Sequence, residues 1–279
     1  MFLDLNGINE YYRMFDRSWN PYSEQGYRHY IRSLEVMKYI TKHQFVKELL
    51  DKREIKILDL CGGCGIGSTA LATVILKRLT DKHISITIVD IRNEALSIAK
   101  KWAKERLGID VETIMLNALE IHKLKRKYDI VLLYGNSISH FSPWDSLILF
   151  STLSDIITDK GIVIIENVDV GSLLLLGYKH IWTEKGPVVN IHTSYDLLKG
   201  TCNRLCMAIG KSKKGRVSLH FWYTASLGAL LYCFFKELSI MMHPWELWTS
   251  YIFARNPRDI RIRRRDIVSI LRERSEFCR

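Results

Sequence analysis

The sequence predicts an α/β protein in which helices cover both faces of a mostly parallel, seven-stranded sheet with an antiparallel last strand. Three observations predict this three-layer sandwich. Short apolar runs alternate with helical segments from residue 55 onward. Uninterrupted apolar runs are typical of strands buried on both faces, as the strands of parallel sheets are. Most intervening segments are also long enough for a crossover helix. Five such strands are expected, at 55–60, 84–90, 111–116, 128–134 and 161–166.

Three helices are expected between these strands. The segment 68–79 follows a glycine-rich turn and is composed of helix-forming residues. In 93–110 apolar residues recur at spacings of three and four, and Gly108 stands where that helix should end. Ser142 can cap the third helix, with Asp145 completing an S-x-x-D capping box.

The remaining segments complete the sheet or lie outside it. Two more strands are expected, at 217–225 and 247–255, and an insertion after the fifth strand is expected to form a hairpin. The predicted division is residues 1–50 for an aromatic N-terminal arm and covering helix, 51–256 for the main domain with an insertion at about 168–216, and 257–279 for a basic tail.

Composition excludes several classes of protein. With 279 residues, 47% of them hydrophobic, the chain can bury a large core, so disorder is not expected. The segment 217–235 lacks charged residues, but its first half has the period of a strand, so we expect a strand and a buried helix and no membrane span. Six unevenly spaced cysteines do not form a disulfide framework, and the first residues do not read as a secretory signal. A cytoplasmic location is the expectation.

The net charge is +11, and much of the basic excess lies in 123–127, 211–216 and the tail. Such runs are most often solvated faces. A basic tail can also bind nucleic acid by neutralising phosphates, so that alternative stays open.

A glycine-dense turn follows the first strand and is typical of a nucleotide cofactor loop. Glycines are needed there because the chain turns sharply and its N–H groups approach a ligand with no side chain between. The first strand ends near Asp59, and the glycines that follow are Gly62, Gly63, Gly65 and Gly67.

Two acids beside this loop favour a positively charged adenosine cofactor. Asp90 ends the second strand, 25 residues after Gly65, where a carboxylate can accept both ribose hydroxyls. Asp59 suits a sulfonium or ammonium group better than a pyrophosphate. From Gly63 the chain reads G-C-G-I-G-S, so the third glycine of a dinucleotide fingerprint falls one place early. A nicotinamide oxidoreductase is therefore disfavoured.

The loop also contains a Cys-x-x-Cys pair, Cys61 and Cys64. This pair could be a redox dithiol or, with Cys202 and Cys206, a zinc site. A metal bound inside the glycine turn would compete with the cofactor for the same space. No metal site is therefore predicted.

These residues together resemble the class I S-adenosylmethionine-dependent methyltransferases, which have a Rossmann-like fold. The segment 57–65, "ILDLCGGCG", is similar to their first motif, with Cys61 where the first glycine is commonest. The segments "MLNALEI" and "YDIVLLYGNSISHF" resemble their motifs after the third and fourth strands, and the likeness spans about residues 50–170. The resemblance implies S-adenosylmethionine as cofactor. It implies these contacts: Asp59, Gly62, Gly63 and Gly65 for methionine; Asp90 for ribose, with the adjoining Ile91 also at the cofactor; Asn117 and Ala118 for adenine; and Tyr134, Gly135 and Asn136 beside the cofactor.

The "GNSISHF" element is also loosely similar to small-molecule N-methyltransferases, among them glycine N-methyltransferase. In those enzymes a basic residue shortly after the fifth strand receives the substrate carboxylate, whereas this chain has Val168 and Asp169. The prediction is methyl transfer by in-line displacement to a small molecule, with N or O as acceptor atom. RNA or ribosomal-protein methylation through the basic tail is the alternative, although N/D-P-P-Y/F and a Pro-Cys pair are missing after the fourth strand. A non-catalytic nucleotide-binding module is a further alternative function.

Acceptor and catalytic residues are less specified. His140 follows the fourth strand on its loop and is the candidate general base, or else a structural histidine. Tyr12, Trp19 and Tyr30 are candidates for contact with the acceptor, or simple packing residues. The sequence does not predict an oligomeric state.

Overall fold

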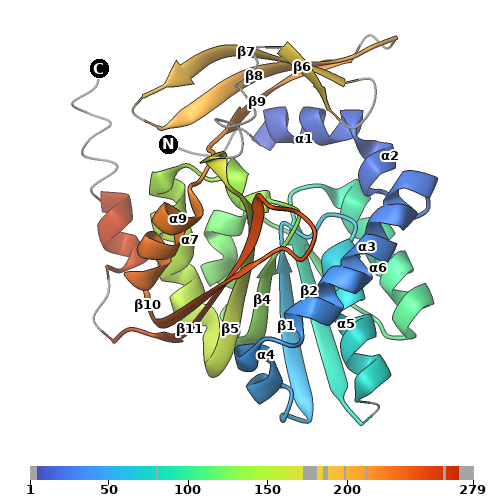
Figure 1. Ribbon diagram of the computed structural model, residues 1–279, viewed down its shortest axis with the longest axis vertical. Coiled ribbons are helices and arrows are strands. Elements are labelled where there is room, and N and C mark those ends of the chain that lie inside the picture. Colours follow the sequence, from blue (N-terminus) through green and yellow to red (C-terminus); the bar gives the residue numbers. More distant parts are fainter. Residues whose placement is uncertain are drawn as a thin grey trace.

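A seven-stranded sheet forms the centre of the computed structural model, which describes residues 5–79, 81–171, 181–184, 188–197, 199–210, 213–259 and 262–269 (Figure 1). The strand order is β10-β11-β5-β4-β1-β2-β3. Neighbouring strands from β5 to β3 are parallel, while β11 is antiparallel to both β5 and β10. The predicted fold class is confirmed. The strands are β1 (Glu54–Leu60), β2 (His83–Asp90), β3 (Glu112–Met115), β4 (Tyr128–Leu133), β5 (Ile157–Val168), β10 (Phe235–Met242) and β11 (Thr249–Pro257).

One of the strands predicted for this sheet does not belong to it. The segment expected as a strand at 217–225 is divided between β9 (Lys214–Leu219), which belongs to a second sheet, and α9 (Thr224–Tyr232). The missing strand is instead β10, at the edge of the main sheet. Because edge strands are half exposed, β10 carries Lys236 and Glu237 and lacks a continuous apolar run.

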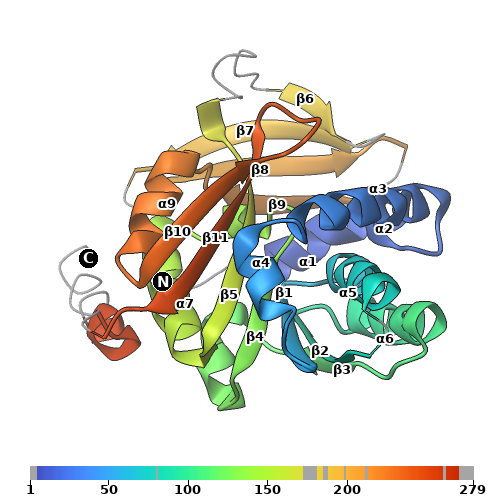
Figure 2. The same cartoon turned by 60° about the horizontal axis from the view of Figure 1, so that its bottom comes forward.

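Helices cover both faces of the main sheet (Figure 2). One core cluster packs α3 (Glu24–Ile40), α4 (Gln44–Leu49), α5 (Ile66–Arg78) and α6 (Asn93–Leu107) on one face. A second cluster packs the 3-10 helix η1 (Ala118–Leu124), α7 (Pro143–Ile156) and α9 on the other. Along β1, Ile57 enters the first cluster and Leu58 the second, as the strand period of two requires.

The capping residues predicted for two helices are found at their ends. Ser142 and Asp145 form the capping box at the start of α7. Gly108 ends α6 in the left-handed conformation, with φ of 71°. Short-range signals therefore determine where these helices begin and end.

The insertion is larger than the expected hairpin. It forms a four-stranded antiparallel sheet in the order β6-β7-β8-β9, with β6 (Ile181–Glu184), β7 (Val188–Asp196) and β8 (Thr201–Ala208) joining β9. This upper sheet stands over the carboxyl ends of the main strands (Figure 1). Helices α1 (Leu5–Met14) and α2 (Asp16–Trp19) lead into α3. Beneath the upper sheet, α1 packs through Ile8 and Tyr11, and Phe15 packs there just after the helix ends.

Other expectations concern the termini and membranes. Residues 260, 261 and 270–279 of the predicted basic tail lie outside the described residues, as do 172–180 of the predicted insertion. Within the described ranges, no helix combines the length and apolarity needed to cross a bilayer.

Candidate active site

The glycine loop joins β1 to α5 through a run of unusual backbone conformations. Gly63 and Gly65 have φ of 53° and 72°, in the left-handed region that glycine tolerates best. Cys61 shares this region, with φ of 59°. A Cβ on Gly62 would lie 2.5 Å from Cγ of Asp59. The turn therefore excludes side chains where it faces Asp59.

Asp59 is a buried carboxyl at the start of this loop. Its Oδ2 accepts hydrogen bonds from the Ser68 amide at 3.1 Å and the Ser68 hydroxyl at 2.5 Å. Burial, with a smaller contribution from the Asp90 charge, raises the pKa of Asp59 to about 6. A cation placed beside it would favour the ionised form.

Asp90 is bonded through all the acceptor sites of its carboxylate. Oδ2 accepts from the Gly63 amide at 2.8 Å, and Oδ1 from the Arg92 amide at 2.9 Å. The Arg92 guanidinium adds bonds of 3.0 Å to Oδ1 and 3.3 Å to Oδ2. A carboxylate has about four lone-pair sites, so a further donor has to replace one of these bonds. The same guanidinium lies 4.2 Å from the centre of the Tyr12 ring.

Two small cavities flank the loop and collect most of the predicted cofactor contacts. A cavity of about 50 Å³ brings together the expected ribose and adenine contacts, namely Asp90, Ile91, Asn117 and Ala118. A cavity of about 40 Å³ brings together the others, namely Asp59, Gly62, Gly63, Tyr134 and Gly135. Tyr12, Cys61 and Arg92 line both.

Three predicted site residues lie elsewhere. A Cβ on Gly65 would meet Ile88 and Ala99, so this glycine lets α5 pack against the sheet and α6. Asn136 accepts a 3.1 Å bond from the Val168 amide and lines a third, larger cavity. Tyr30, expected to contact the acceptor, is 4% exposed, bonds Thr73 and lines none of these three cavities. Because its ring packs in the core, Tyr30 has the surroundings of a packing residue.

The third cavity has a volume of about 360 Å³ and lies between the two sheets. Its walls come from α1, α2, α3, the ends of β4 and β5, the upper sheet and the β10–β11 turn. The predicted residues Tyr12, Trp19 and His140 line it. Tyr12 also lines both small cavities, so its side chain stands where all three meet.

His140 is partly buried, and its imidazole is uncharged at neutral pH. Its Nε2 lies 2.9 Å from the Tyr12 hydroxyl, and its Nδ1 has no hydrogen-bond partner among the described residues. Burial, reinforced by the nearby Arg92 charge, lowers the pKa of His140 to about 4. The His140 imidazole is thus hydrogen-bonded and uncharged, and it faces the large cavity, where it could act as a base or serve a structural role.

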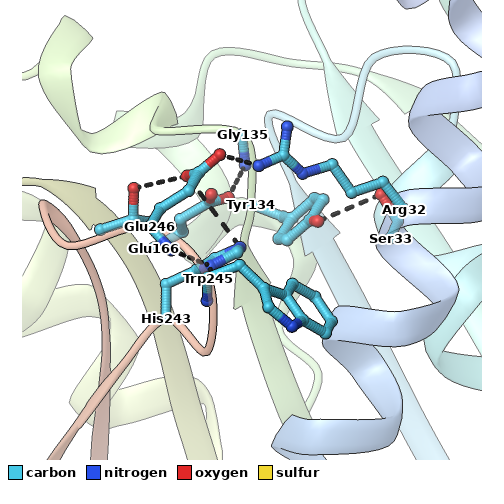
Figure 3. A network of polar contacts seen from close by, with 9 residues as sticks. Arg32, Ser33, Tyr134, Gly135, Glu166, His243, Trp245 and Glu246 are labelled. Atoms are coloured by element: carbon cyan, nitrogen blue, oxygen red, sulfur yellow. Dashed lines mark hydrogen bonds and ion pairs between the residues drawn. The ribbon is translucent and has the colours of Figure 1, made fainter.

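A polar network crosses one wall of the large cavity (Figure 3). Arg32 of α3 pairs with Glu246 of the β10–β11 turn, and Glu246 also accepts a 2.8 Å bond from Thr249. At the end of β5, Glu166 accepts a 2.6 Å bond from the Gly135 amide. These contacts connect α3 with the β10–β11 turn, and β5 with the segment after β4, around the large cavity. Arg32, Glu246, His243 and Arg204 line this cavity and were not anticipated, because no local motif marks them.

The cysteine pairs are not brought together as a metal site. Cys206 bonds Asn190 within the upper sheet, away from the loop, at 3.0 Å. Burial raises the pKa of Cys64 to about 11, so its thiol stays protonated at neutral pH. Across the described residues, no group of three or more His, Cys, Asp or Glu side chains is arranged to hold a metal ion.

Comparisons with known proteins concern the domain and the fold. Residues 57–161 match the family model described as a methyltransferase domain. No curated protein sequence matches the chain. Among solved structures, the PH0226 protein of Pyrococcus horikoshii is similar, with 23% identity, a TM-score of 0.63 and coverage of 89% of this chain and 99% of that one.

Two further solved structures share the fold at lower identity. An S-adenosylmethionine-dependent methyltransferase from Clostridium acetobutylicum has 12% identity and a TM-score of 0.61, covering 88% of this chain and 98% of its own. The magnesium protoporphyrin IX methyltransferase of Synechocystis, solved with bound SAH, has 14% identity and a TM-score of 0.55, covering 92% and 100%. Residues 57–161 therefore match a methyltransferase domain, and this match together with the shared fold is consistent with an S-adenosylmethionine-dependent methyltransferase of class I.

Proposed function

We propose that this enzyme transfers a methyl group to a nitrogen or oxygen atom of a small molecule bound in the cavity between its two sheets. One observation carries the proposal: Tyr12 lines the large cavity and both cavities of the cofactor loop. A cofactor on the loop and an acceptor in the large cavity would therefore meet at Tyr12. The volume of about 360 Å³ lies in the range of small-molecule pockets, about 300–1,000 Å³.

The residues of the loop fit S-adenosylmethionine in charge and shape. The buried Asp59 would supply a negative charge for the cationic methionine part, and Gly62 has no side chain to clash with that carboxyl. Asp90 would hold the ribose, with its hydroxyls replacing the guanidinium bonds of Arg92. Asn117 and Ala118 would flank the adenine. When bound, the cofactor supplies a methyl group on a positively charged sulfur.

The chain's own contribution would be alignment, exclusion of water and handling of a proton. Bound on the loop, the cofactor would supply its methyl group to a lone pair of the acceptor and would keep the carbon–sulfur electron pair as a neutral thioether. Tyr12 and His140 form a hydrogen-bonded pair facing the acceptor cavity. If the acceptor arrives protonated, the Tyr12 oxygen would take its proton while the Tyr12 hydroxyl proton moves to Nε2 of His140. The neutral imidazole has the protonation state that this relay requires.

Calorimetric titration of the purified protein with S-adenosylmethionine, SAH and NAD tests the proposal. We expect the first two to bind and NAD not to bind. The Asp90→Ala variant should lose about 1–3 kcal/mol of affinity for SAH, the value of charge-assisted hydrogen bonds. Unchanged affinity in that variant would remove Asp90 from the ribose site.

Methylation of RNA or a ribosomal protein is a second candidate, favoured by the net charge of +11. A macromolecular acceptor predicts binding that falls steeply with salt, because phosphate contacts release counterions. A small-molecule acceptor predicts little such dependence. Fluorescence titration with a labelled RNA at about 50 and 200 mM salt distinguishes the two candidates.

A further inference from the structure

The two arginines that line the large cavity are held in different ways. Arg32 pairs with Glu246, so its charge is balanced within the wall. Arg204 lies on β8 and is 6% exposed. Its guanidinium carbon lies 4.3 Å from the centre of the Trp182 ring and 4.5 Å from that of Phe221. Aromatic rings thus position a buried cation at the cavity.

The strand directs Arg204 toward the space between the sheets. Residues two apart on a strand face the same side, and Cys206 on that side packs in the core cluster with α1. Stacking on rings uses the faces of a guanidinium, whereas its N–H donors lie in its plane. That planar edge matches carboxylate and phosphate oxygens in paired bonds.

The opposite wall carries negative charge. Glu166 ends β5 and accepts a bond from the Gly135 amide, beside the loop that faces the cofactor cavity. A bound anion would be repelled from Glu166 and attracted to Arg204. The cavity would therefore orient an acidic molecule with its anion at Arg204 of the upper sheet and away from Glu166.

We propose that Arg204 binds an acidic group of the methyl acceptor, a carboxylate or a phosphate, and so selects anionic acceptors over neutral ones. The inference rests on the proposed function, since it assumes that the acceptor occupies this cavity. It names Arg204 as a specificity-determining residue contributed by the inserted sheet.

Calorimetry with matched probes tests the anion site. Benzoate and benzamide have nearly the same shape and differ in charge, and phenyl phosphate separates phosphate from carboxylate recognition. Each is titrated at millimolar concentration into the protein with and without SAH. We expect benzoate or phenyl phosphate to bind the wild-type protein at least about tenfold more tightly than benzamide.

Variants assign that preference to a residue. Arg204→Met should reduce the ratio of anion to benzamide affinity to about one, and Arg204→Lys should retain part of it. Arg216→Met is the matched control, because Arg216 is an exposed arginine on the neighbouring strand β9, and it should keep the wild-type ratio. Thermal melts establish that each variant is folded, and the wild-type ratio stands as a test even if Arg204→Met does not fold.

Each outcome has one meaning. Equal binding of anion and amide, no binding of either anion, or an anion preference that survives in Arg204→Met would overturn the anion site. SAH binding without anion preference leaves the proposed function standing. Anion binding that depends on Arg204 in a protein that does not bind SAH supports the site and contradicts the proposed function.

Discussion

The proposed cofactor side and the proposed acceptor side of the site draw on residues that are spread very differently along the chain. The residues that line the loop cavities lie mostly between Asp59 and Phe141, at the ends of consecutive parallel strands. The large cavity takes residues from Tyr11 to Glu246, from both sheets and four separate connections. The proposed cofactor site is thus formed by local motifs, whereas the proposed acceptor site uses elements attached to that core.

Breaking the ion pair between Asp90 and Arg92 on the cofactor side should reduce stability the most. Asp90→Asn removes the charge that pairs with Arg92, whose side chain is 15% exposed beside the 6% exposed carboxylate. Breaking one partner of a buried pair costs about 3–5 kcal/mol, because the other charge stays buried. We expect this loss in the free energy of unfolding by urea.

An exposed ion pair serves as the control. Asp110 bonds Lys104 at 2.8 Å, and the two side chains are 77% and 54% exposed. Asp110→Asn should cost much less stability than Asp90→Asn, because solvent screens an exposed ion pair. Equal losses in the two variants would show that Asp90 does not anchor the loop.

Removing the hydrogen bond between Tyr12 and His140, where the cofactor side meets the acceptor side, should reduce stability by an intermediate amount. Tyr12→Phe removes the hydroxyl that bonds Nε2 of His140. The imidazole ring of His140 is then left with no described hydrogen-bond partner at either nitrogen. Such a loss costs about 1–3 kcal/mol in the free energy of unfolding.

Tyr22→Phe is the matched variant at the surface. The Tyr22 ring is 46% exposed, and its hydroxyl bonds Glu105 at 2.8 Å. This variant should change stability by less than about 0.5 kcal/mol, because water replaces the lost bond. A Tyr12→Phe protein as stable as Tyr22→Phe would mean that α1 is not coupled to His140.

The pH dependence of cofactor affinity measures the charge on the cofactor side. The pKa of Asp59 is raised from 3.8 to about 6 in the folded protein, so folding favours its protonated form. The stability that this proton contributes is present below pH 3.8 and is lost as pH rises through 6. The ionised form attracts a cation, so S-adenosylmethionine should bind about tenfold more tightly at pH 7 than at pH 5.

Asp59→Asn keeps the shape of this side chain and removes its titration. Calorimetry at both pH values should show little change in affinity for this variant. A wild-type affinity that is flat between the two values would exclude an ionising Asp59 from the cofactor site.

The same contrast explains what the sequence could predict. Asp59 and Asp90 were predictable because glycine spacing and strand alternation mark the ends of β1 and β2. Arg204 and Glu246 were not, since they reach the cavity through the upper sheet and the β10–β11 turn, and no spacing in the sequence links them to the loop. The strand β10 was missed for a related reason, because its half-exposed pattern depends on its place at the sheet edge.

The smallest expected effect concerns the one departure within the loop motif, Cys61. Its φ of 59° costs a residue with a Cβ about 1–2 kcal/mol, whereas glycine adopts it without strain. Cys61→Gly would relieve this strain, but it would also add about 0.5–1 kcal/mol of backbone entropy cost and remove a partly buried thiol. Stability measured by thermal melting should therefore stay within about 1 kcal/mol of the wild-type value.

Cys64→Gly is the control that isolates the strain, because Cys64 is 8% exposed and its φ is not positive. Without strain to relieve, this variant should be less stable than Cys61→Gly by about 1–2 kcal/mol. Equal destabilisation of the two variants would mean that the left-handed turn at Cys61 carries no cost. The position would then accept cysteine as readily as glycine, and the departure from the motif would need no compensation elsewhere.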